Sequence, residues 1–333
     1  MTAAAREIDA IVVNRDRADM LCAALGSIGA ALEASGAAGR TIVVYNGSRD
    51  DSEERVRREF PSARWIQTGG NMGFPSAVNA GLEQSSADWV LLLNNDATIE
   101  PDAVRRVFEH RIPEDVGTIA MQMRFADRPG IVNSAGIGVD VLGVAFDRHL
   151  GTPADGPAST PGEVFGACAG AALYRRAMLD DIGGFDGGIF LYLDDADVAW
   201  RARMAGWRAL YVPDAVVWHA HSATTRHGSS FKYFHVGRSR VRLLAKNADR
   251  RQLLRYGVQM VAFDLGYVAF VAAVDRTLAP LRGRLAGLRE WRRVRAENAT
   301  RRRPVEFDRR QGFAAALRRR RAWLAGSGPQ RTG

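Results

Sequence analysis

Short apolar runs separated by helical patterns dominate the first hundred residues of the chain. Each run is four to six residues long and nearly all apolar, which predicts a buried strand. Strands of this kind that alternate with helices are typical of an α/β fold with a mainly parallel sheet flanked by helices. The predicted strands span residues 8–13, 41–45, 64–67 and 89–93, and the predicted helices end near residue 32 or span 51–60 and 75–84.

Polar residues follow three of these strands. Asn14 and Asp16 come after the first strand, Asn46 after the second, and Asn95 and Asp96 after the fourth. Ligands bind beyond the carboxyl ends of the strands in such sheets. A carboxylate at the end of a buried strand can hold a hard divalent cation that bridges phosphate oxygens. The alternative, that Asp96 caps the next helix, requires a long reach because that helix begins five residues later.

The stretch 189–219 contains the densest group of chemically useful side chains. Asp194, Asp195 and Asp197 open a helical pattern that stops at Gly206, and His219 ends the apolar run that follows. A carboxylate at a helix start and an imidazole at a strand end suit general-base and metal-ligand roles. The alternative is structural. Asp is favoured in the first turn of a helix, and Asp197 can pair with an arginine one turn on. Between the turn and His219, the sequence predicts two short strands, 209–212 and 215–218.

The totals limit the class of protein. The chain has 333 residues, of which 47% are apolar, enough for one large domain or one domain with an appendage. Cys22 and Cys168 are its only cysteines and lie far apart, which argues against a disulfide framework or a zinc site. The first residues lack the pattern of a secretory signal peptide, so we expect a cytoplasmic protein.

The last third of the chain is rich in arginine and accounts for much of the net charge of +9. An apolar run at 258–274 is shorter than a membrane span and is interrupted by Asp264. Its flanking arginines favour peripheral contact with an anionic membrane. The alternatives are a helix that packs on the rest of the chain or forms a homo-oligomer. Nucleic-acid binding is disfavoured because interleaved aromatic residues are lacking.

Seven segments together resemble glycosyltransferase family 2, and they appear in the family's order. The likeness covers residues 8–247 and is nearest to the bacterial rhamnosyltransferase and galactofuranosyltransferase-like branch. It implies a GT-A (Rossmann-like) fold over residues 1–247, followed by an Arg-rich helical C-terminal extension at 248–333. The segments are IVVNRD (11–16), YNGSRDDS (45–52), GGNMGFPSAVNAGL (69–82), LLLNNDATIEPDA (91–103), GACAGAALYRRAMLDDIGGFD (166–186), LYLDDADVAWRARMAGWRALYVPDAVVWH (191–219) and KYFHVGRSRVRLLAKN (232–247).

The resemblance implies a role for each matching residue. Asp195 matches the family's catalytic base. Asp96 matches the acid that grips the diphosphate of a nucleotide-sugar through Mg or Mn, and His219 matches a histidine that helps to hold the metal, with His221 as a second candidate. Tyr45 stands where relatives carry an acid that contacts the base, and we predict that it stacks on the base instead. The residues matched to substrate binding are Asn14, Asp16, Tyr45, Asn46, Asn71, Gly73, Asn79, Asn95, Asp194 and Arg238.

The resemblance also implies the reaction. One catalytic base without a second carboxylate nucleophile suits a single inverting displacement. Among donors we favour dTDP-rhamnose, with UDP-sugars, such as a galactofuranosyl donor, as the alternative. The expected acceptor is a cell-surface polysaccharide or a lipid-linked glycan, at the inner face of the cell membrane. A non-catalytic scaffold that binds nucleotide-sugars or glycans is the competing hypothesis.

Overall fold

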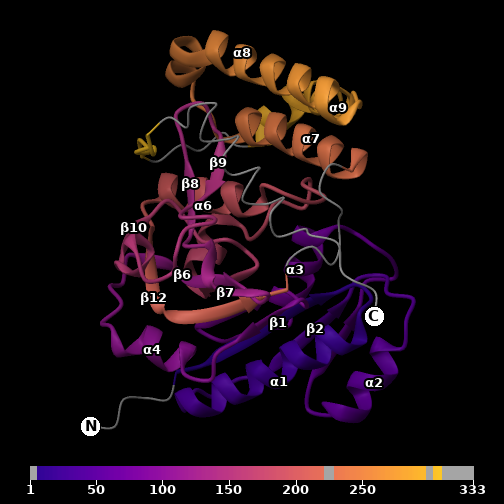
Figure 1. Cartoon of the computed structure of the whole chain (residues 1–333), viewed down its shortest axis with the longest axis vertical. Coiled ribbons are helices and arrows are strands. Elements are labelled where there is room, and N and C mark those ends of the chain that lie inside the picture. Colours follow the sequence, from indigo (N-terminus) through magenta and orange to yellow (C-terminus); the bar gives the residue numbers. More distant parts are fainter. Residues whose placement is uncertain (1–5, 221–228, 298–302, 310–333) are drawn as a thin grey trace.

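The first half of the chain forms a parallel sheet. The computed structural model describes residues 6–220, 229–297 and 303–309. Four strands lie side by side in the order β3–β2–β1–β4, and all of them are parallel (Figure 1). The interiors of β1, β2 and β4 are apolar and buried, whereas the edge strand β3 is only partly buried, and all four strands confirm the prediction from the sequence. Their bounds are β1 Ile8–Asn14, β2 Thr41–Tyr45, β3 Arg64–Gln67 and β4 Trp89–Leu93.

The second half of the chain extends this sheet beyond β4. The strand β11 (Ala171–Arg175) runs antiparallel between β4 and β6 (Val116–Phe125), and β12 (Arg208–His219) lies parallel to β6. Six strands therefore point the same way, so the expected mainly parallel α/β sheet is confirmed. Short antiparallel strands and one helical turn complete this part: β5 Ala97–Ile99, β7 Arg128–Ser134, β10 Gly162–Val164 and the 3-10 turn Pro157–Ser159.

The two strands predicted at 209–212 and 215–218 are a single strand in the structure. Strand β12 runs without a break through Pro213, but its pairing with β6 shifts between Val212 and Val216. Proline lacks an N–H group and cannot donate to a neighbouring strand, so it is tolerated in a strand at such an irregularity. The proline therefore marks a bulge and not the end of a strand.

Helices cover both faces of the sheet. One face packs against apolar side chains of α1, α2 and α4, and the other packs against α3, α5 and α6. The alternation of buried side chains along β1 and β4 supplies both contacts, as expected for strands buried on two faces. The bounds of these helices are α1 Ala18–Ser35, α2 Ser52–Glu59, α3 Phe74–Leu82, α4 Ala103–Glu109, α5 Arg176–Ile182 and α6 Asp194–Ala205.

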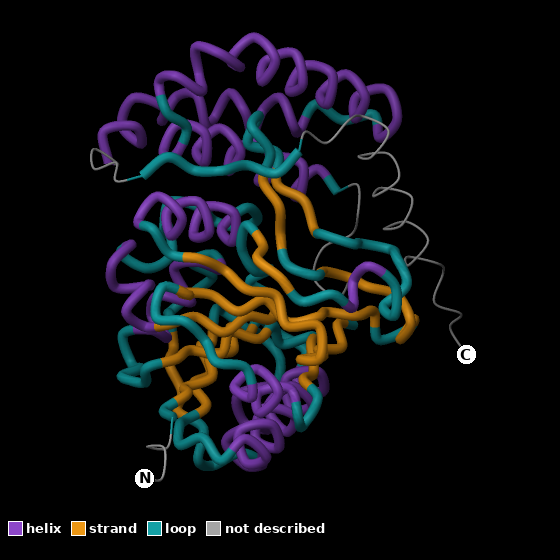
Figure 2. Tube along the Cα trace, turned by 90° about the vertical axis from the view of Figure 1, so that its left-hand side faces the viewer, coloured by secondary structure: helices purple, strands orange, loops and turns teal. Residues whose placement is uncertain are grey.

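Three long helices form a further layer above α6, which confirms the C-terminal helical region (Figure 2). They are α7 Ser230–Asn247, α8 Arg250–Asp275 and α9 Ala279–Glu297. A third core joins Trp200 of α6 to Leu243 and Leu244 of α7 and Met260 of α8. The hairpin of β8 (Ile137–Val139) and β9 (Ala145–Asp147) also packs here. The boundary proposed at residue 247 remains a prediction, since α7 packs closely against α9.

Candidate active site

The carboxyl ends of β1 and β4 are joined by asparagine side chains. Asn95 Nδ2 donates to Asn14 Oδ1 at 2.8 Å, and Asn14 Nδ2 donates to the hydroxyl oxygens of Ser48 and Ser52 at 3.1 and 3.0 Å. Asn14 is fully buried. These bonds fix the loops after β1, β2 and β4 relative to one another. Asn14 and Asn95 were predicted to bind substrate, and the structure shows that their amides hold the protein frame of the site.

Asn46 organises the glycine-rich loop in a similar way. Its Oδ1 accepts from the N–H of Met72 at 2.9 Å, and its Nδ2 donates to Asn71 Oδ1 at 3.2 Å. The loop then passes so close to Phe190 that a Cβ on Gly73 would lie 2.5 Å from the Phe190 carbonyl oxygen. Gly73 also has φ +86°, which a side chain rarely adopts. The loop after β3 therefore requires glycine at position 73, next to the segment that leads into α6.

Three other residues matched to substrate binding have defined places. Asn79 donates to the carbonyl of Phe185 at 2.8 Å and accepts from its N–H at 2.9 Å, so its amide fixes the segment before α6. Asp16 accepts from the N–H of Arg49 at 2.7 Å. Tyr45 is the last residue of β2 and is partly exposed, and its ring centroid lies 6.2 Å from that of Trp65. Stacking of Tyr45 on a nucleobase remains a prediction.

Asp96 and His219 are brought together by the sheet. Asp96 follows β4, and His219 ends β12, which pairs with β5 directly after Asp96. The Nε2 of His219 lies 3.2 Å from Asp96 Oδ1, and its Nδ1 lies 3.0 Å from Asn133 Oδ1. Burial alone would raise the pKa of Asp96, but the hydrogen bond and charge of His219 and the charge of Arg17 hold it below its ordinary value. Asp96 is therefore a stable carboxylate.

The hydrogen bonds of His219 fit a metal ligand. An amide oxygen only accepts, so the Nδ1 of His219 donates to Asn133. Its Nε2 then faces the Oδ1 of Asp96, so the imidazole nitrogen and the carboxylate oxygen could bind one cation together. A histidine ligand whose other nitrogen donates to an oxygen is the usual arrangement at metal sites. The donor set therefore fits Mg or Mn. His221, the second candidate, lies outside the described residues.

Few protein ligands are available at this position. Within residues 6–220, 229–297 and 303–309, no group of three or more His, Cys, Asp and Glu side chains is arranged to hold a metal ion. Asp96 and His219 alone would leave most coordination positions open. Oxygens of a diphosphate and water are suitable ligands for those positions, because Mg commonly binds through one or two carboxylates together with substrate phosphates.

The second part of the candidate site is the start of α6. Tyr192 and Leu193 both have left-handed backbone angles, φ +66° and +63°, directly before Asp194. Such angles are uncommon in residues other than glycine and tend to cluster at functional sites. Asp16 and Arg17, which follow β1, share the same conformation. Four of the six such residues in the described chain therefore lie in loops that carry predicted site residues.

Asp194 and Asp195 lie in surroundings that disfavour negative charge. Burial raises the pKa of Asp195, and the carboxylates of Asp194 and Asp147 raise it further. Burial likewise raises the pKa of Asp194 to about 6, with a contribution from Asp197. Asp194 is buried, whereas Asp195 is partly exposed. A carboxylate whose pKa is raised toward neutrality is suited to accept a proton from a substrate.

Asp195 and Asp96 are connected through one short segment. The N–H of Ala169 donates to Asp195. The next residue, Gly170, accepts from the N–H of Asn94 at 2.9 Å, two positions before Asp96. The segment that precedes β11 thus links the start of α6 to the end of β4. Asp96 and His219 are therefore in contact, and Asp195 is linked to the same end of the sheet by hydrogen bonds.

Asp197 and Arg238 belong to a structural network. Asp197 is fully buried, receives two bonds from Arg201 at 2.8 and 2.6 Å, and accepts from Asn247 at 2.8 Å. This pairing with an arginine one turn on is the structural role that the sequence offers for Asp197 as the alternative to a role in catalysis. Arg238 makes a bidentate contact with Glu290 of α9. A contact of Arg238 with a diphosphate remains a prediction, and the structure gives the side chain a protein partner.

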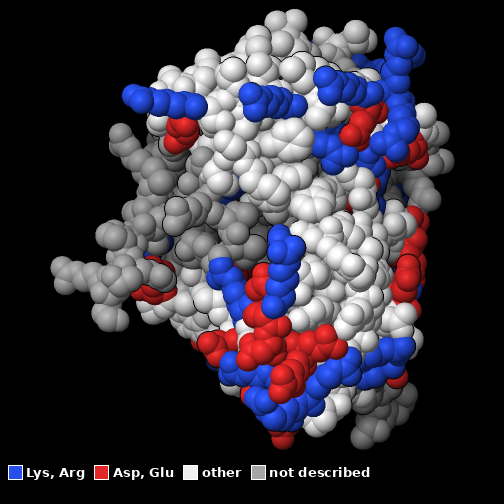
Figure 3. All heavy atoms as spheres, turned by 90° about the vertical axis from the view of Figure 1, so that its right-hand side faces the viewer, with Lys and Arg blue, Asp and Glu red and all other residues white. Residues whose placement is uncertain are grey.

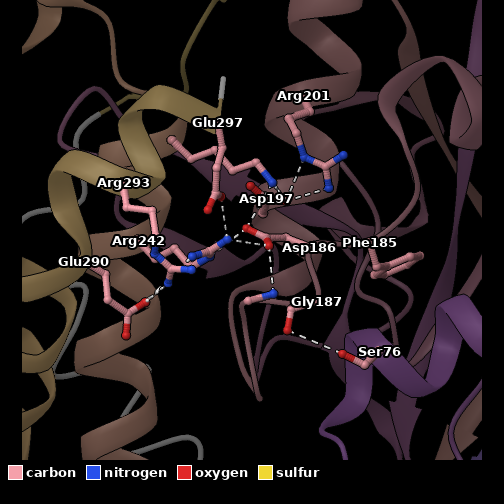
Figure 4. A network of polar contacts seen from close by, with 12 residues as sticks. Ser76, Phe185, Asp186, Gly187, Asp197, Arg201, Arg242, Glu290, Arg293 and Glu297 are labelled. Atoms are coloured by element: carbon pink, nitrogen blue, oxygen red, sulfur yellow. Dashed lines mark hydrogen bonds and ion pairs between the residues drawn. The ribbon is translucent and has the colours of Figure 1, made fainter. Parts of the chain in front are cut away.

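Asp186 lies at the centre of this network (Figure 4). Arg242 of α7 makes two bonds to its carboxylate, both at 2.8 Å, and Lys246 lies 3.0 Å away. These two cations hold the pKa of Asp186 far below its ordinary value, although burial acts in the opposite direction. The network joins the segment before α6 to α7 and α9. It thereby fixes the position of the helical layer on the catalytic half of the chain.

The structure also reveals residues that the sequence did not suggest. Asp147, at the end of β9, acts electrostatically on Asp195 and on Lys232. Lys232 lies over the ring of Tyr192, with Nζ 5.4 Å from the centroid, and burial lowers its pKa to about 8. Asn133 supports His219. Lys232 opens the last of the seven family segments but was given no role there. Asn133 and Asp147 belong to no recognisable local motif, because they lie on local hairpins that reach β12 and α6 only through tertiary packing.

A nucleotide-sugar transferase is the class of protein that this fold and this rim define. The model of the family "Glycosyltransferase like family 2" matches residues 5–235, more than half of the chain. The chain therefore belongs to glycosyltransferase family 2, and it is a glycosyltransferase. The resemblance stated from the sequence is confirmed, and a non-catalytic scaffold loses its basis.

Individual relatives agree with this assignment. The N-acetylglucosaminyl-diphospho-decaprenol L-rhamnosyltransferase of Mycobacterium tuberculosis is 30% identical over 211 residues, which cover 54% of this chain and 67% of that protein. The poly-beta-1,6-N-acetyl-D-glucosamine synthase of Staphylococcus aureus is 23% identical over 180 residues, covering 53% of this chain and 42% of that protein. Both relatives are named as enzymes that transfer or polymerise sugars.

A solved structure supports the fold. The mannosyltransferase PcManGT from Pyrobaculum calidifontis, in complex with GDP-Man and Mn²⁺, superimposes with a TM-score of 0.52 at 19% identity. The match covers 98% of this chain and 82% of that chain. The GT-A architecture predicted from the sequence is therefore confirmed.

Proposed function

We propose that the chain transfers a sugar from a nucleotide-sugar to an acceptor hydroxyl with inversion, and that Asp195 is the general base. The observation that carries this proposal is the environment of Asp195: a partly exposed carboxylate at a helix start whose pKa burial and two neighbouring carboxylates raise. Burial and neighbouring negative charge make such a carboxylate a stronger proton acceptor than an ordinary aspartate.

The step proceeds as a single displacement. The acceptor oxygen forms a bond to the anomeric carbon as the bond from that carbon to the diphosphate oxygen breaks. The acceptor proton passes to the carboxylate of Asp195, and the nucleoside diphosphate leaves. Asp197 is bound by Arg201 and Asn247, and Asp194 is buried. Their positions favour one base over the two-carboxylate double displacement, which needs a second exposed nucleophile.

Asp96 and His219 are proposed to hold a divalent cation, Mg or Mn. When bound, the cation neutralises the charge that develops on the departing diphosphate. The proposal is supported by the low pKa of Asp96, by the His219–Asn133 contact and by the Mn²⁺ in the mannosyltransferase structure. The chain's own contribution is to hold an anionic oxygen and an imidazole nitrogen 3.2 Å apart at the end of the sheet.

We propose rhamnose from dTDP-rhamnose as the donor sugar and a lipid-linked glycan as the acceptor. The support is the mycobacterial relative, whose name gives L-rhamnosyl transfer and a diphospho-decaprenol acceptor. An acceptor of this kind lies at a membrane and would place the enzyme at the cytoplasmic face. UDP-sugars are the competing donors, because the resemblance also covers the galactofuranosyltransferase-like branch.

The test is a transfer assay with the full chain, Mn²⁺ and an N-acetylglucosaminyl-diphospho-lipid acceptor. dTDP-rhamnose should give a rhamnosylated product by mass spectrometry, and UDP-sugars should give far less. Asp195→Asn should lower kcat about 10³-fold or more while donor binding by calorimetry stays within about twofold. Asp155→Asn, at an exposed acid, is the matched control. Turnover that survives Asp195→Asn would refute the base, and a preference for UDP-sugars would refute the donor.

A further inference from the structure

The outer side of α8 and α9 is an exposed apolar surface. Leu254 and Val258 of α8 are 88% and 86% exposed, and Val261 and Leu265 continue the same stripe at spacings of three and four residues. On α9, Leu285 and Leu288 are also about half exposed, at 47% and 55%. We call this surface the α8–α9 face. Exposed apolar side chains gathered on helices in this way mark a site of interaction with a protein or a membrane.

Acidic side chains of α8 and α9 point away from this face. Asp264, in the middle of the apolar stretch, binds Arg240 of α7 at 2.7 Å and Arg284 of α9 at 2.6 Å. The other three carboxylates of residues 250–297 also have partners on α7. Asp275 accepts from Tyr233, Glu290 binds Arg238, and Glu297 binds Arg242, at 2.6, 2.8 and 2.9 Å.

Arginines provide the charges on the outside. Residues 250–297 contain ten arginines and four carboxylates. Two of the arginines, Arg284 and Arg295, turn inward. Figure 3 shows basic side chains projecting from the upper part of the molecule, where α8 and α9 lie, with a few acidic side chains beside them and a largely uncharged surface below. The exposed arginines are Arg250, Arg251, Arg255, Arg276, Arg282, Arg289, Arg292 and Arg293.

We propose that the α8–α9 face binds the surface of an anionic bilayer, with α8 lying in the plane of the interface. The stripe of Leu and Val supplies apolar area for the acyl boundary, and the surrounding arginines match anionic headgroups. Sorting of the acids to the inner side makes the outer side complementary to negative charge. This inference goes beyond the transfer reaction and depends on neither the donor nor the acceptor.

The same observations disfavour a helix that spans the membrane. By length and composition, α1 and α8 are the two described helices that could cross a bilayer, but α1 is a core helix with Leu21 and Ile28 fully buried. A spanning α8 would carry Asp264 in the middle of the hydrocarbon layer, which is costly. In the structure that carboxylate instead anchors α8 to Arg240 and Arg284.

A second copy of the chain fits the face less well than a bilayer does. Two-fold dimers join the same patch on both subunits. Such a contact would place the arginines around Leu254 and Val258 near their own counterparts, and like charges that face each other oppose association. A bilayer that contains anionic lipid offers apolar area and negative charge together. The observed chemistry therefore favours lipid.

Vesicle flotation of the full chain tests the proposal. The chain should float with vesicles of phosphatidylcholine that contain about one third phosphatidylglycerol, should bind neutral vesicles much more weakly, and should lose binding as salt screens the charges. Arg251→Gln with Arg255→Gln should weaken binding about 25-fold, since each arginine contributes about fivefold. Leu254→Glu with Val258→Glu should reduce it at least tenfold. Arg58→Gln with Arg105→Gln, on α2 and α4, is the charge-matched control and should leave binding unchanged.

Two results would overturn the proposal. Failure to bind either kind of vesicle, or equal binding to neutral and anionic vesicles, would exclude recognition of anionic lipid. Light scattering that shows a dimer, dissociated by Leu254→Glu with Val258→Glu, would assign the face to a second copy. Transfer to a short water-soluble acceptor should stay within twofold in all face variants. That assay separates a failed membrane proposal from a failed donor assignment.

Discussion

The two ends of the candidate site hold carboxylates in opposite electrostatic surroundings. Asp96, at the end of β4, has His219 at 3.2 Å and the positive charge of Arg17 nearby, and its pKa is lowered. Asp195, at the start of α6, has two carboxylates as neighbours, and its pKa is raised. Both groups lose solvent on folding, so burial acts on both in the same direction. The sign of the neighbouring charge decides the outcome.

This difference separates the two chemical tasks. A group that must hold a cation benefits from being anionic at every working pH, and a group that must take up a proton benefits from a pKa nearer neutrality. Asp186 provides an internal reference for Asp96 and Asp195. It is also a buried aspartate and has two cationic partners, but it does not belong to the candidate site. Four predictions compare these acids, from the largest expected effect to the smallest.

Asp186→Asn should destabilise the fold by about 3–5 kcal/mol, because it leaves the buried Arg242 and Lys246 without their shared anion. The lowered pKa of Asp186 means that its stabilisation is present above about pH 4 and is lost as the pH falls further. Urea unfolding at pH 7 measures the change. Asp155→Asn should stay within about 0.5 kcal/mol. A similarly small effect of Asp186→Asn would show that the network is dispensable.

Asp96→Asn should weaken activation by Mn²⁺ at least 100-fold, because it removes the anionic ligand beside His219. The acid limb of the pH–rate profile at saturating metal should not move, since Asp195 sets it. A metal titration of the transfer rate at several pH values gives both quantities. An unchanged Mn²⁺ requirement would remove Asp96 from the metal site.

Asp194→Asn should raise stability by about 2 kcal/mol at pH 8 and have little effect at pH 4. The folded pKa of about 6 lies above the ordinary 3.8, so ionisation of Asp194 destabilises the fold progressively between those values. The substitution removes that penalty where the group is charged. Thermal unfolding across pH measures it. A gain that is the same at both pH values would indicate a packing effect.

Asp147→Asn should produce the smallest change, a shift of the acid limb of kcat toward lower pH. The substitution removes one of the charges that raise the pKa of Asp195, so rates on the acid limb should rise about two- to fivefold while the plateau rate at higher pH stays the same. The full pH–rate profile measures the shift. A limb that moves to higher pH would contradict the arrangement of charges described for Asp195.

The sequence predicted those strands that a short stretch of residues is enough to define. The strands at 41–45, 64–67 and 89–93 match the structure residue for residue. For 41–45 and 89–93 the reason is that nearly continuous apolar runs between turns fit strands buried on both faces. The placement of β11 between β4 and β6 has no such signal, because it depends on pairing across large sequence separations. Asp147 and Asn133 lie on local hairpins, but their contacts with α6 and β12 are distant in the sequence, and for this reason the sequence did not single them out.

Asparagines show a second limit of sequence reasoning. The resemblance assigns Asn14, Asn46, Asn79 and Asn95 to substrate binding, which stays a prediction. Their amides bond to serine hydroxyls, backbone groups and one another. An amide can satisfy donors and acceptors in several directions, and a motif cannot reveal which of them the protein itself uses.

The bulge in β12 has a consequence for the spacing of the site. His219 is the last residue of this strand. The extra residues between Val212 and Val216 determine which residue of β6 lies opposite His219. Successive side chains of a strand point to opposite faces, so one residue added or removed at 213–215 would turn the imidazole away from Asp96. Relatives that keep this histidine should therefore tolerate length changes in surface loops but not at 213–215. The number of residues at these positions sets the distance between His219 and Asp96.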